Sequence, residues 1–223
     1  MIIGNGQIAK AFKKKKNLFK DEIIFASGNA NSKNKKEVEF KREINLLKRT
    51  LKKNQKKKLF YFSTLDVLRK KNSKYIDHKK NIEKILKKNK NAFILRLPQV
   101  IGISKNKFTV FNFLKINIKK NIKIIVNQNF YRNFIDSNDI PLIVNKVKKN
   151  SKTNNIINIF CKRSIKISYL VDLMIAHYKL KNLKFKRNLV KDDFYRDMRK
   201  FKKRNFFVID KKNYYQKLLK KYL

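Results

Sequence analysis

The chain begins Met1-Ile-Ile-Gly4-Asn-Gly6-Gln-Ile-Ala9, and this stretch indicates how the rest of the sequence folds. A short apolar run leads directly into two closely spaced glycines, and a helical pattern follows them. Gly4 permits a tight turn, Gly6 lets a phosphate group approach the backbone, and Ala9 allows a helix to pack closely on a strand. The start of such a helix offers unpaired N–H groups to an anion. The stretch therefore predicts a strand, a phosphate-binding turn and a helix. The alternative is an ordinary tight turn.

Further short apolar runs, separated by amphipathic stretches, follow this first unit. The runs are continuous rather than alternating, which is typical of buried strands, and they cover Ile23–Ala26, Leu59–Phe62, Phe93–Leu95 and Ile156–Phe160. Helices are predicted over Gln7–Asn17, Glu37–Asn54 and Tyr75–Lys88. Strands and helices that alternate at this spacing indicate right-handed crossover units. We therefore predict an α/β protein with a parallel sheet and helices on both faces.

Small or polar residues follow the predicted strands. They are Gly4-Asn5-Gly6, Ala26-Ser27-Gly28, Ser63-Thr64 and Arg96-Leu97-Pro98-Gln99. In an open parallel sheet, ligands bind outside the carboxyl ends of the strands. From Ile103 onward the pattern is less regular, and we expect a smaller lobe there that covers this edge.

Tyr75 and Lys79 are one helical turn apart, on the same face of a predicted helix. A free phenol has a pKa of about 10, and a neighbouring ammonium group favours the phenolate and lowers this pKa. The pair therefore predicts a tyrosine that acts as acid or base near neutral pH. Thr64, at a strand end, is placed to bind the same substrate oxygen. Because lysine is abundant in this chain, an exposed helix pair is the alternative.

The composition excludes several classes of protein. Hydrophobic residues make up 42% of the 223 residues, which is enough for a packed core. No apolar stretch approaches the ~18 residues that cross a bilayer, and the N-terminus lacks a signal layout, so we expect a cytoplasmic protein without a membrane partner. Cys161 is the single cysteine, and His78 and His177 are far apart, so no internal disulfide and no metal site is predicted.

The charge balance is strongly basic, with 60 Lys and Arg against 15 Asp and Glu and a formal net charge of +45. Such a chain is predicted to bind polyanions non-specifically at low salt. A nucleic-acid-binding function would use the same charge. The lysines are spread over the whole chain, and Asn and Ile are abundant alongside them. This pattern favours compositional drift over a selected nucleic-acid surface.

Taken in order, these segments resemble the extended short-chain dehydrogenase/reductases, the NAD-dependent epimerase/dehydratase family that acts on nucleotide sugars. The similar segments are Asp21–Gly28, Phe60–Val67, Tyr75–Lys79 with the following Glu83, Ile94–Gly102, Tyr131–Asp136 and Ile165–Leu173. The resemblance implies a Rossmann-like domain in residues 1–105. It also implies a smaller substrate-binding lobe in residues 106–223, with segments that return to the main sheet.

The resemblance also implies the ligands and the roles of individual residues. The cofactor would be NAD or NADP and the substrate a nucleotide sugar, with Tyr75 as general acid/base, Lys79 on the nicotinamide ribose and Thr64 on the substrate oxygen. Substrate contacts would come from Gln99 and from Arg132, which would meet the diphosphate. The cofactor-binding residues would be Gly4, Asn5, Gly6, Gln7, Ile8, Ala26, Ser27, Gly28, Tyr75, Lys79 and Pro98. A homodimer through helices 37–54 and 75–88 is implied as well, although their many lysines would repel across a symmetric interface.

The chain departs from the family in its cofactor half. The first helix leads directly into what resembles the family's fourth strand, so the second and third strands are missing, together with part of the adenine pocket. After Thr64, the acid pair of dehydratases becomes Leu65-Asp66, which favours reduction or epimerisation over dehydration. Three functions remain: a nucleotide-sugar enzyme, a non-catalytic binding protein on a degenerate dehydrogenase fold, and a basic nucleic-acid-binding protein.

Overall fold

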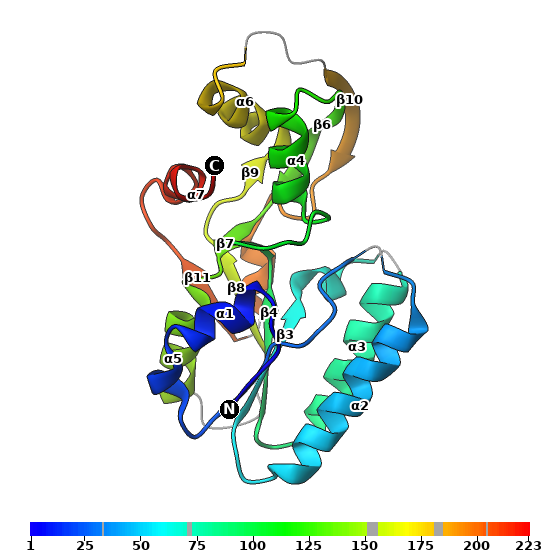
Figure 1. Ribbon diagram of the computed structural model, residues 1–223, viewed down its shortest axis with the longest axis vertical. Helices are drawn as coiled ribbons and strands as arrows, with labels where there is room; N and C mark the ends of the chain where they lie inside the picture. The colour runs from blue at the N-terminus through cyan, green and yellow to red at the C-terminus, as the bar shows by residue number, and fades with distance from the viewer. Residues whose placement is uncertain (33, 71–72, 151–155, 181–184, 204) are drawn as a thin grey trace.

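A six-stranded parallel sheet forms the larger half of the molecule (Figure 1). The computed structural model describes residues 1–223 except residues 33, 71–72, 151–155, 181–184 and 204. The strands stand in the order β1 (Ile2–Ile3), β2 (Ile23–Phe25), β3 (Leu59–Thr64), β4 (Ala92–Leu97), β8 (Ile156–Cys161) and β11 (Phe206–Ile209), all parallel to their neighbours. The predicted α/β fold with a parallel sheet is confirmed. β11 is a strand that the sequence reasoning missed.

Helices cover both faces of this sheet (Figure 1). The helices are α1 (Gln7–Lys13) and α5 (Ile140–Asn150) on one face, and α2 (Glu37–Lys53) and α3 (Lys74–Lys87) on the other. Successive side chains of a strand point to opposite faces. Ile24 therefore packs in the core with α1 and α5, whereas Ile23 and Phe25 pack with α2 and α3. In the described part of the chain, no helix has the length and apolar character needed to span a membrane.

The first two crossovers of the sheet have opposite hands. β1 to β2 and β2 to β3 step across the sheet in the same direction, yet α1 and α2 lie on opposite faces. For a given direction, a right-handed crossover places its helix on one particular face. One of the two crossovers is therefore left-handed, and the prediction of right-handed units throughout is wrong.

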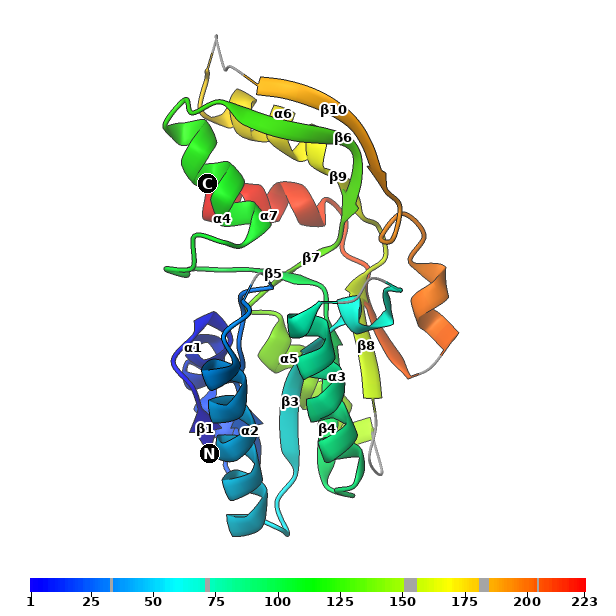
Figure 2. The same ribbon diagram turned by 90° about the vertical axis from the view of Figure 1, so that its right-hand side faces the viewer.

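A smaller lobe stands over the carboxyl ends of the strands (Figure 2). Its strands are β6 (Ile124–Arg132), β9 (Ile165–Lys166) and β10 (Phe185–Asp192) in one sheet, and β5 (Gln99–Ile101) paired with β7 (Phe134–Asp136). Its helices are α4 (Val110–Lys119), α6 (Ile167–His177) and α7 (Tyr214–Tyr222), and they share one apolar core with β6. Short 3-10 helices cover Lys16–Phe19 (η1), Leu65–Leu68 (η2) and Arg199–Lys203 (η3).

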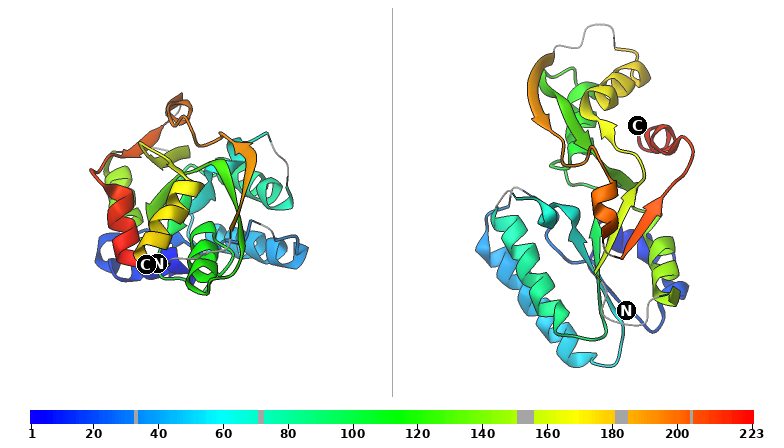
Figure 3. Two further views of the ribbon diagram at one scale, coloured as in Figure 1. Left: turned by 90° about the horizontal axis from the view of Figure 1, so that it is seen from above. Right: turned by 180° about the vertical axis from the view of Figure 1, so that it is seen from behind.

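The chain passes between the two halves more than once (Figure 3). β8 and β11 belong to the main sheet, although each of them follows elements of the lobe. The lobe is consequently anchored by several connections, and its position over the sheet edge is held by the fold itself. The boundary between residues 105 and 106 stays a prediction.

Candidate functional site

A cleft of about 310 Å³ opens between the carboxyl ends of the strands and the lobe. On the sheet side, the lining includes predicted site residues from separate segments: Gly6, Gln7, Ile8, Ala26, Gly28, Thr64, Tyr75, Lys79, Pro98 and Gln99. The lobe side includes Phe134 and residues 104, 106 and 108–111, which lead into α4. Gly4, Asn5, Ser27 and Arg132 were also predicted for the site, and they do not belong to this lining.

The two glycines of the first turn differ in whether a side chain would fit at their position. Gly4 has a φ of +121°, and a Cβ added to it would lie 2.3 Å from the carbonyl oxygen of Ala26. Only glycine fits there, because both the backbone conformation and the neighbouring strand exclude a side chain. Gly6 precedes α1 with ordinary extended backbone, and nothing lies within 4 Å of a Cβ added to it. The space beside Gly6 is therefore open to a ligand. Asn5 accepts a hydrogen bond from Nζ of Lys13 at 3.2 Å.

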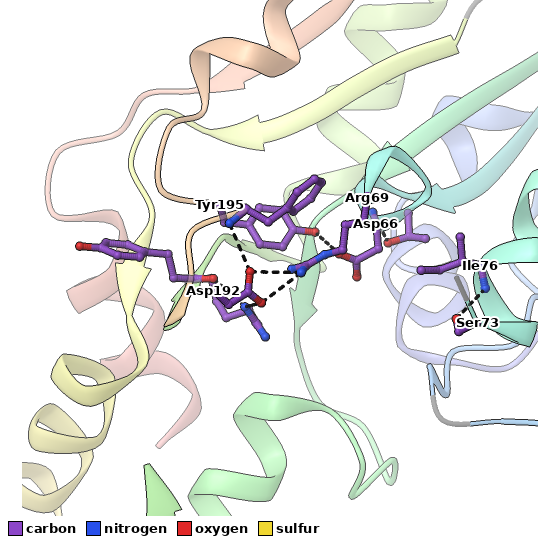
Figure 4. A network of polar contacts seen from close by, with 10 residues as sticks. Asp66, Arg69, Ser73, Ile76, Asp192 and Tyr195 are labelled. Atoms are coloured by element: carbon purple, nitrogen blue, oxygen red, sulfur yellow. Dashed lines mark hydrogen bonds and ion pairs between the residues drawn. The ribbon is translucent and has the colours of Figure 1, made fainter. Parts of the chain in front are cut away.

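Thr64 and Tyr75 reach the cleft from two neighbouring elements. Thr64 ends β3 and caps the start of η2: its Oγ1 accepts a hydrogen bond from the Asp66 amide at 3.2 Å. Tyr75 lies in the first turn of α3, where Oγ of Ser73 accepts a hydrogen bond from the Ile76 amide at 3.2 Å (Figure 4). This cap fixes the start of the helix, and with it the position of the phenol.

Burial raises the pKa of the Tyr75 phenol, and the nearby negative charges of Asp66 and Glu43 add to the effect. The prediction that Lys79 lowers this pKa is therefore wrong. The physical reason is that the ammonium of Lys79 lies 5.8 Å from the centre of the Tyr75 ring and makes its hydrogen bonds elsewhere. Tyr75 is thus a protonated phenol at neutral pH.

Lys79 forms a buried ion pair with Glu43, a residue that the sequence reasoning missed. Nζ of Lys79 donates to Oε1 of Glu43 at 3.0 Å and to the hydroxyl of Tyr61 at 2.7 Å. Nε2 of His78 lies 2.9 Å from Oε2 of Glu43, and the Asn29 amide donates to the same oxygen at 2.8 Å. A single carboxylate therefore joins α2, α3, β3 and the loop that follows β2.

The surroundings of Glu43 stabilise its charged form. Burial alone would raise the pKa of this carboxyl, but the hydrogen bond from His78, the charge of Lys79 and the bonds from Asn29 and Tyr61 lower it to about 2. Burial in turn lowers the pKa of Lys79, while the charge of Glu43 acts in the opposite direction. The pair is thus charged at neutral pH, because each charge offsets the cost of burying the other.

Gly28 lies directly against this ion pair. A Cβ added to Gly28 would be 2.9 Å from Nζ of Lys79 and 2.9 Å from Oε1 of Glu43. The absence of a side chain lets the loop after β2 approach both charges closely. Gly28 and Lys79 consequently line the same wall of the cleft.

Ser63 and Thr64 are the two hydroxyl residues at the end of β3, and a second buried ion pair binds the hydroxyl of Ser63. Nε of Arg96 donates to Oε1 of Glu83 at 2.9 Å, and Nη2 of Arg96 lies 2.5 Å from Oε2. Oγ of Ser63 donates to Oε1 of the same carboxylate at 2.6 Å. The hydroxyl of Ser63 is therefore used within the buried network, while Thr64 ends the strand at the cleft.

The two predicted substrate-binding residues have different surroundings. Gln99 lines the cleft, and within the described residues its Oε1 is buried and has no hydrogen-bond partner. Arg132 donates from Nη1 to the carbonyl of Tyr131 and to Oδ2 of Asp192, each at 2.8 Å. The guanidinium of Arg132 is thus bound to an internal carboxylate.

Asp192 stands at the centre of a polar network, part of which is labelled in Figure 4. Besides Arg132, it accepts hydrogen bonds from Nη1 of Arg69 at 3.0 and 3.1 Å. Nε of Arg69 lies 2.5 Å from Oδ1 of Asp66, which also accepts a hydrogen bond from Tyr195 at 3.0 Å. Because Asp66 lines the cleft, the network extends from the cleft wall to the end of β10.

Comparisons with known proteins bear on the fold. No protein-family model matches the chain, and no curated protein matches its sequence. Among solved structures, WbmG from Bordetella bronchiseptica in complex with NAD and UDP is similar with a TM-score of 0.65 and 14% identity, over 98% of this chain and 78% of that one. UDP-glucose 4-epimerase from Thermotoga maritima with UDP-glucose has a TM-score of 0.62 and 15% identity, over 84% and 71% of the two chains. RMD from Pseudomonas aeruginosa with NADPH has a TM-score of 0.63 and 15% identity, over 75% of this chain and 69% of that one.

Each of these chains is longer than the present one. They share its parallel sheet with helices on both faces. The similarity therefore shows that the chain has the same overall fold as these structures, a parallel sheet with helices on both faces.

Proposed function

We propose that the protein is an NAD(P)-dependent enzyme that reduces or epimerises a nucleotide sugar. The observation that carries this proposal is the single cleft in which the glycine turn, Thr64, Tyr75 and Lys79 meet, although they come from separate segments. Similar folds bind NAD and UDP, UDP-glucose or NADPH at low sequence identity, which supports the same classes of ligand here.

The residues present fit a dinucleotide along the wall from Gly6 to Lys79. Gly6 has open space where a diphosphate would lie, and the loop at Gly28 brings backbone close to the cleft without a side chain in the way. Ala26 and Pro98 would pack against the cofactor, and Lys79 would bind its ribose. When bound, the cofactor would supply or accept the hydride. Gly4, Asn5 and Ser27 would act by shaping this turn and loop.

The proton would come from Tyr75. Because burial raises the pKa of its phenol, Tyr75 is protonated at neutral pH and is prepared to give a proton to a carbonyl oxygen. Thr64 would hold the same oxygen by a hydrogen bond. In the reducing direction, Tyr75 would give its proton to the carbonyl oxygen while the cofactor supplied the hydride for the carbonyl carbon, so that a hydroxyl group would form.

Substrate contacts would come from Gln99 and Arg132. The unpartnered Oε1 of Gln99 can accept a hydrogen bond from a ligand N–H or O–H. A guanidinium suits the oxygens of a diphosphate, but Arg132 first has to leave its ion pair with Asp192. Binding of the diphosphate would therefore be accompanied by a rearrangement at the end of β10.

A thermal-shift screen tests this proposal directly. Ligands that bind the native state raise the melting temperature, so NAD(H), NADP(H) and UDP-, GDP-, dTDP- and CDP-sugars should divide into binders and non-binders. Turnover is then measured with each binding pair, from the absorbance of the reduced nicotinamide. A screen in which no dinucleotide stabilises the protein would contradict the proposal.

A non-catalytic binding protein on the same fold is the second candidate. Lys79 and Arg132 are both held by internal carboxylates, and the strands that complete the adenine pocket are missing. This candidate predicts that a nucleotide sugar binds without any transfer of hydride. The homodimer through α2 and α3 stays a prediction for either function.

A further inference from the structure

We propose that Glu43 is the positioning residue of this site: its carboxylate fixes Lys79 and the cofactor-side loop as one unit beside Tyr75. The catalytic part of this inference rests on the proposed function, since it assigns Tyr75 to acid/base chemistry. Glu43 lies under the cleft wall, outside the residues that line the cleft.

The geometry of the carboxylate supports a positioning role. Both oxygens are occupied: Oε1 by Lys79 and Tyr61, and Oε2 by His78 and the Asn29 amide, all within 3.0 Å. The partners belong to α3, to β3 and to the loop after β2, while Glu43 itself belongs to α2. Its side chain is 0% exposed, so water does not compete for these bonds. Movement of the loop relative to Lys79 would therefore break hydrogen bonds to a buried anion.

The ion pair also directs the donors of Lys79. An ammonium group has three N–H donors, and two of them point to Glu43 and Tyr61. Lys79 belongs to the cleft lining, and its Nζ lies against Gly28. The remaining donor is thus the one available to a hydroxyl in the cleft, and Glu43 determines its direction.

The charge of Glu43 acts on Tyr75 as well. The charged and titratable groups near this phenol are Asp66 from η2, Glu43 from α2, Lys79 from α3 and Tyr61 from β3. Glu43 compensates the cation of Lys79, and Asp66 is itself paired with Arg69. Burial and the two carboxylates together disfavour a phenolate at Tyr75.

The experiment measures the ionisation of Tyr75 by NMR, with tyrosine labelled at Cζ and the signal assigned through Tyr75→Phe. In Glu43→Gln, the midpoint for Tyr75 should fall by about one pH unit or more, a tenfold change in the acid constant, because an anion is removed and a cation is left. Glu43→Asp keeps the charge but is shorter, so it should leave the Tyr75 midpoint close to that of the wild type. Both variants should bind NAD(P)H about tenfold more weakly than the wild type, because the loop loses its anchor at Asn29.

Glu83→Gln is the matched control, because Glu83 is also buried, belongs to α3 and pairs with Arg96 instead. It should lower the melting temperature without moving the Tyr75 midpoint. An unchanged or raised midpoint in Glu43→Gln, or an equal shift in Glu83→Gln, would overturn the inference.

The NMR readout does not depend on turnover, so it separates this inference from the proposed function. If the wild-type protein binds no dinucleotide, the proposed function is contradicted. The role of Glu43 is then still tested by the Tyr75 titration. If Glu43→Gln does not fold, Glu43→Asp decides: an affinity for NAD(P)H about tenfold below that of the wild type supports the inference, and an undiminished affinity overturns it.

Discussion

Nζ of Lys79 lies 3.0 Å from Oε1 of Glu43, and the two side chains are 2% and 0% exposed. Removing one member of such a pair leaves the other charge buried without compensation, which typically costs about 3–5 kcal/mol. We therefore expect Lys79→Met to lower the free energy of unfolding by this amount, measured by urea denaturation. In the double variant Glu43→Gln/Lys79→Met, most of the loss should be recovered, because neither charge remains. A double variant less stable than Lys79→Met would show that the hydrogen bonds of Glu43 matter more than its charge.

The same pair makes stability depend on acid. The pKa of Glu43 falls from 4.5 to about 2 on folding, so between these values the unfolded state binds more protons than the native state. This contribution is present in full above pH ~5 and is lost as the pH falls towards 2, a total of about 3 kcal/mol. Urea denaturation at pH 7, 4 and 3 should show the difference between wild type and Glu43→Gln shrinking as the pH falls. A constant difference would contradict a lowered pKa at Glu43.

Gly4 and Gly6 allow cofactor binding and folding to be separated. Gly6→Ala should fold with a stability within about 1 kcal/mol of the wild type, since nothing lies within 4 Å of the added Cβ. Its affinity for NAD(P)H should nevertheless fall at least tenfold, because the new methyl group occupies space proposed for the diphosphate. Gly4→Ala should be unstable, because its Cβ would lie 2.3 Å from the Ala26 oxygen. Fluorescence titration and thermal melts measure both effects, and undiminished binding by Gly6→Ala would place the diphosphate elsewhere.

Tyr75→Phe removes the proposed proton donor and keeps the ring. Turnover should fall by a factor of about 10² to 10⁴, the usual contribution of general acid catalysis. Binding of NAD(P)H should change little. The decisive comparison is between rate and affinity in the same preparation, and a variant with full turnover would remove Tyr75 from the mechanism.

Asp192→Asn tests whether the internal carboxylate competes with a substrate diphosphate. Asp192 accepts from Arg69 and Arg132, at 3.0 and 2.8 Å. Without its charge, the guanidinium of Arg132 should bind diphosphate more readily, and the affinity for UDP should rise on the order of tenfold in calorimetry. The neighbouring Asp193→Asn gives the same change in net charge and should have a much smaller effect. Weaker UDP binding by Asp192→Asn would instead show that Asp192 positions the two arginines.

The main sheet could be predicted because its central strands are buried on both faces. Their sequences, such as Leu59–Phe62, are continuous apolar runs, which few other structures produce. The carboxyl ends of these strands converge by topology, so the cleft residues could be predicted from the small and polar residues that follow each run. The prediction of crossover hand was wrong because the hand depends on the face of the sheet against which each helix packs, and no local pattern records that face.

Glu43 and the Asp192 network could not be predicted in the same way. Glu43 does leave one signal, an acid on the apolar face of a helix between Phe40 and Leu47. Its partners, however, are set by three-dimensional packing and come from segments without a shared motif. The ion pair of Arg132 and Asp192 joins residues far apart in sequence, within a lobe whose pattern is irregular. Charged residues in such a basic chain are too common for their pairing to be read from sequence.

The strands of the main sheet stand side by side in the order in which they are synthesised. Protein chains leave the ribosome from the N-terminus and fold progressively. A nascent chain of this protein can therefore add each strand to the one made just before it, always at the same growing edge. No later strand has to be inserted between two that are already paired. A partly synthesised chain would therefore already expose the native edge strand with which the next strand of this sheet pairs.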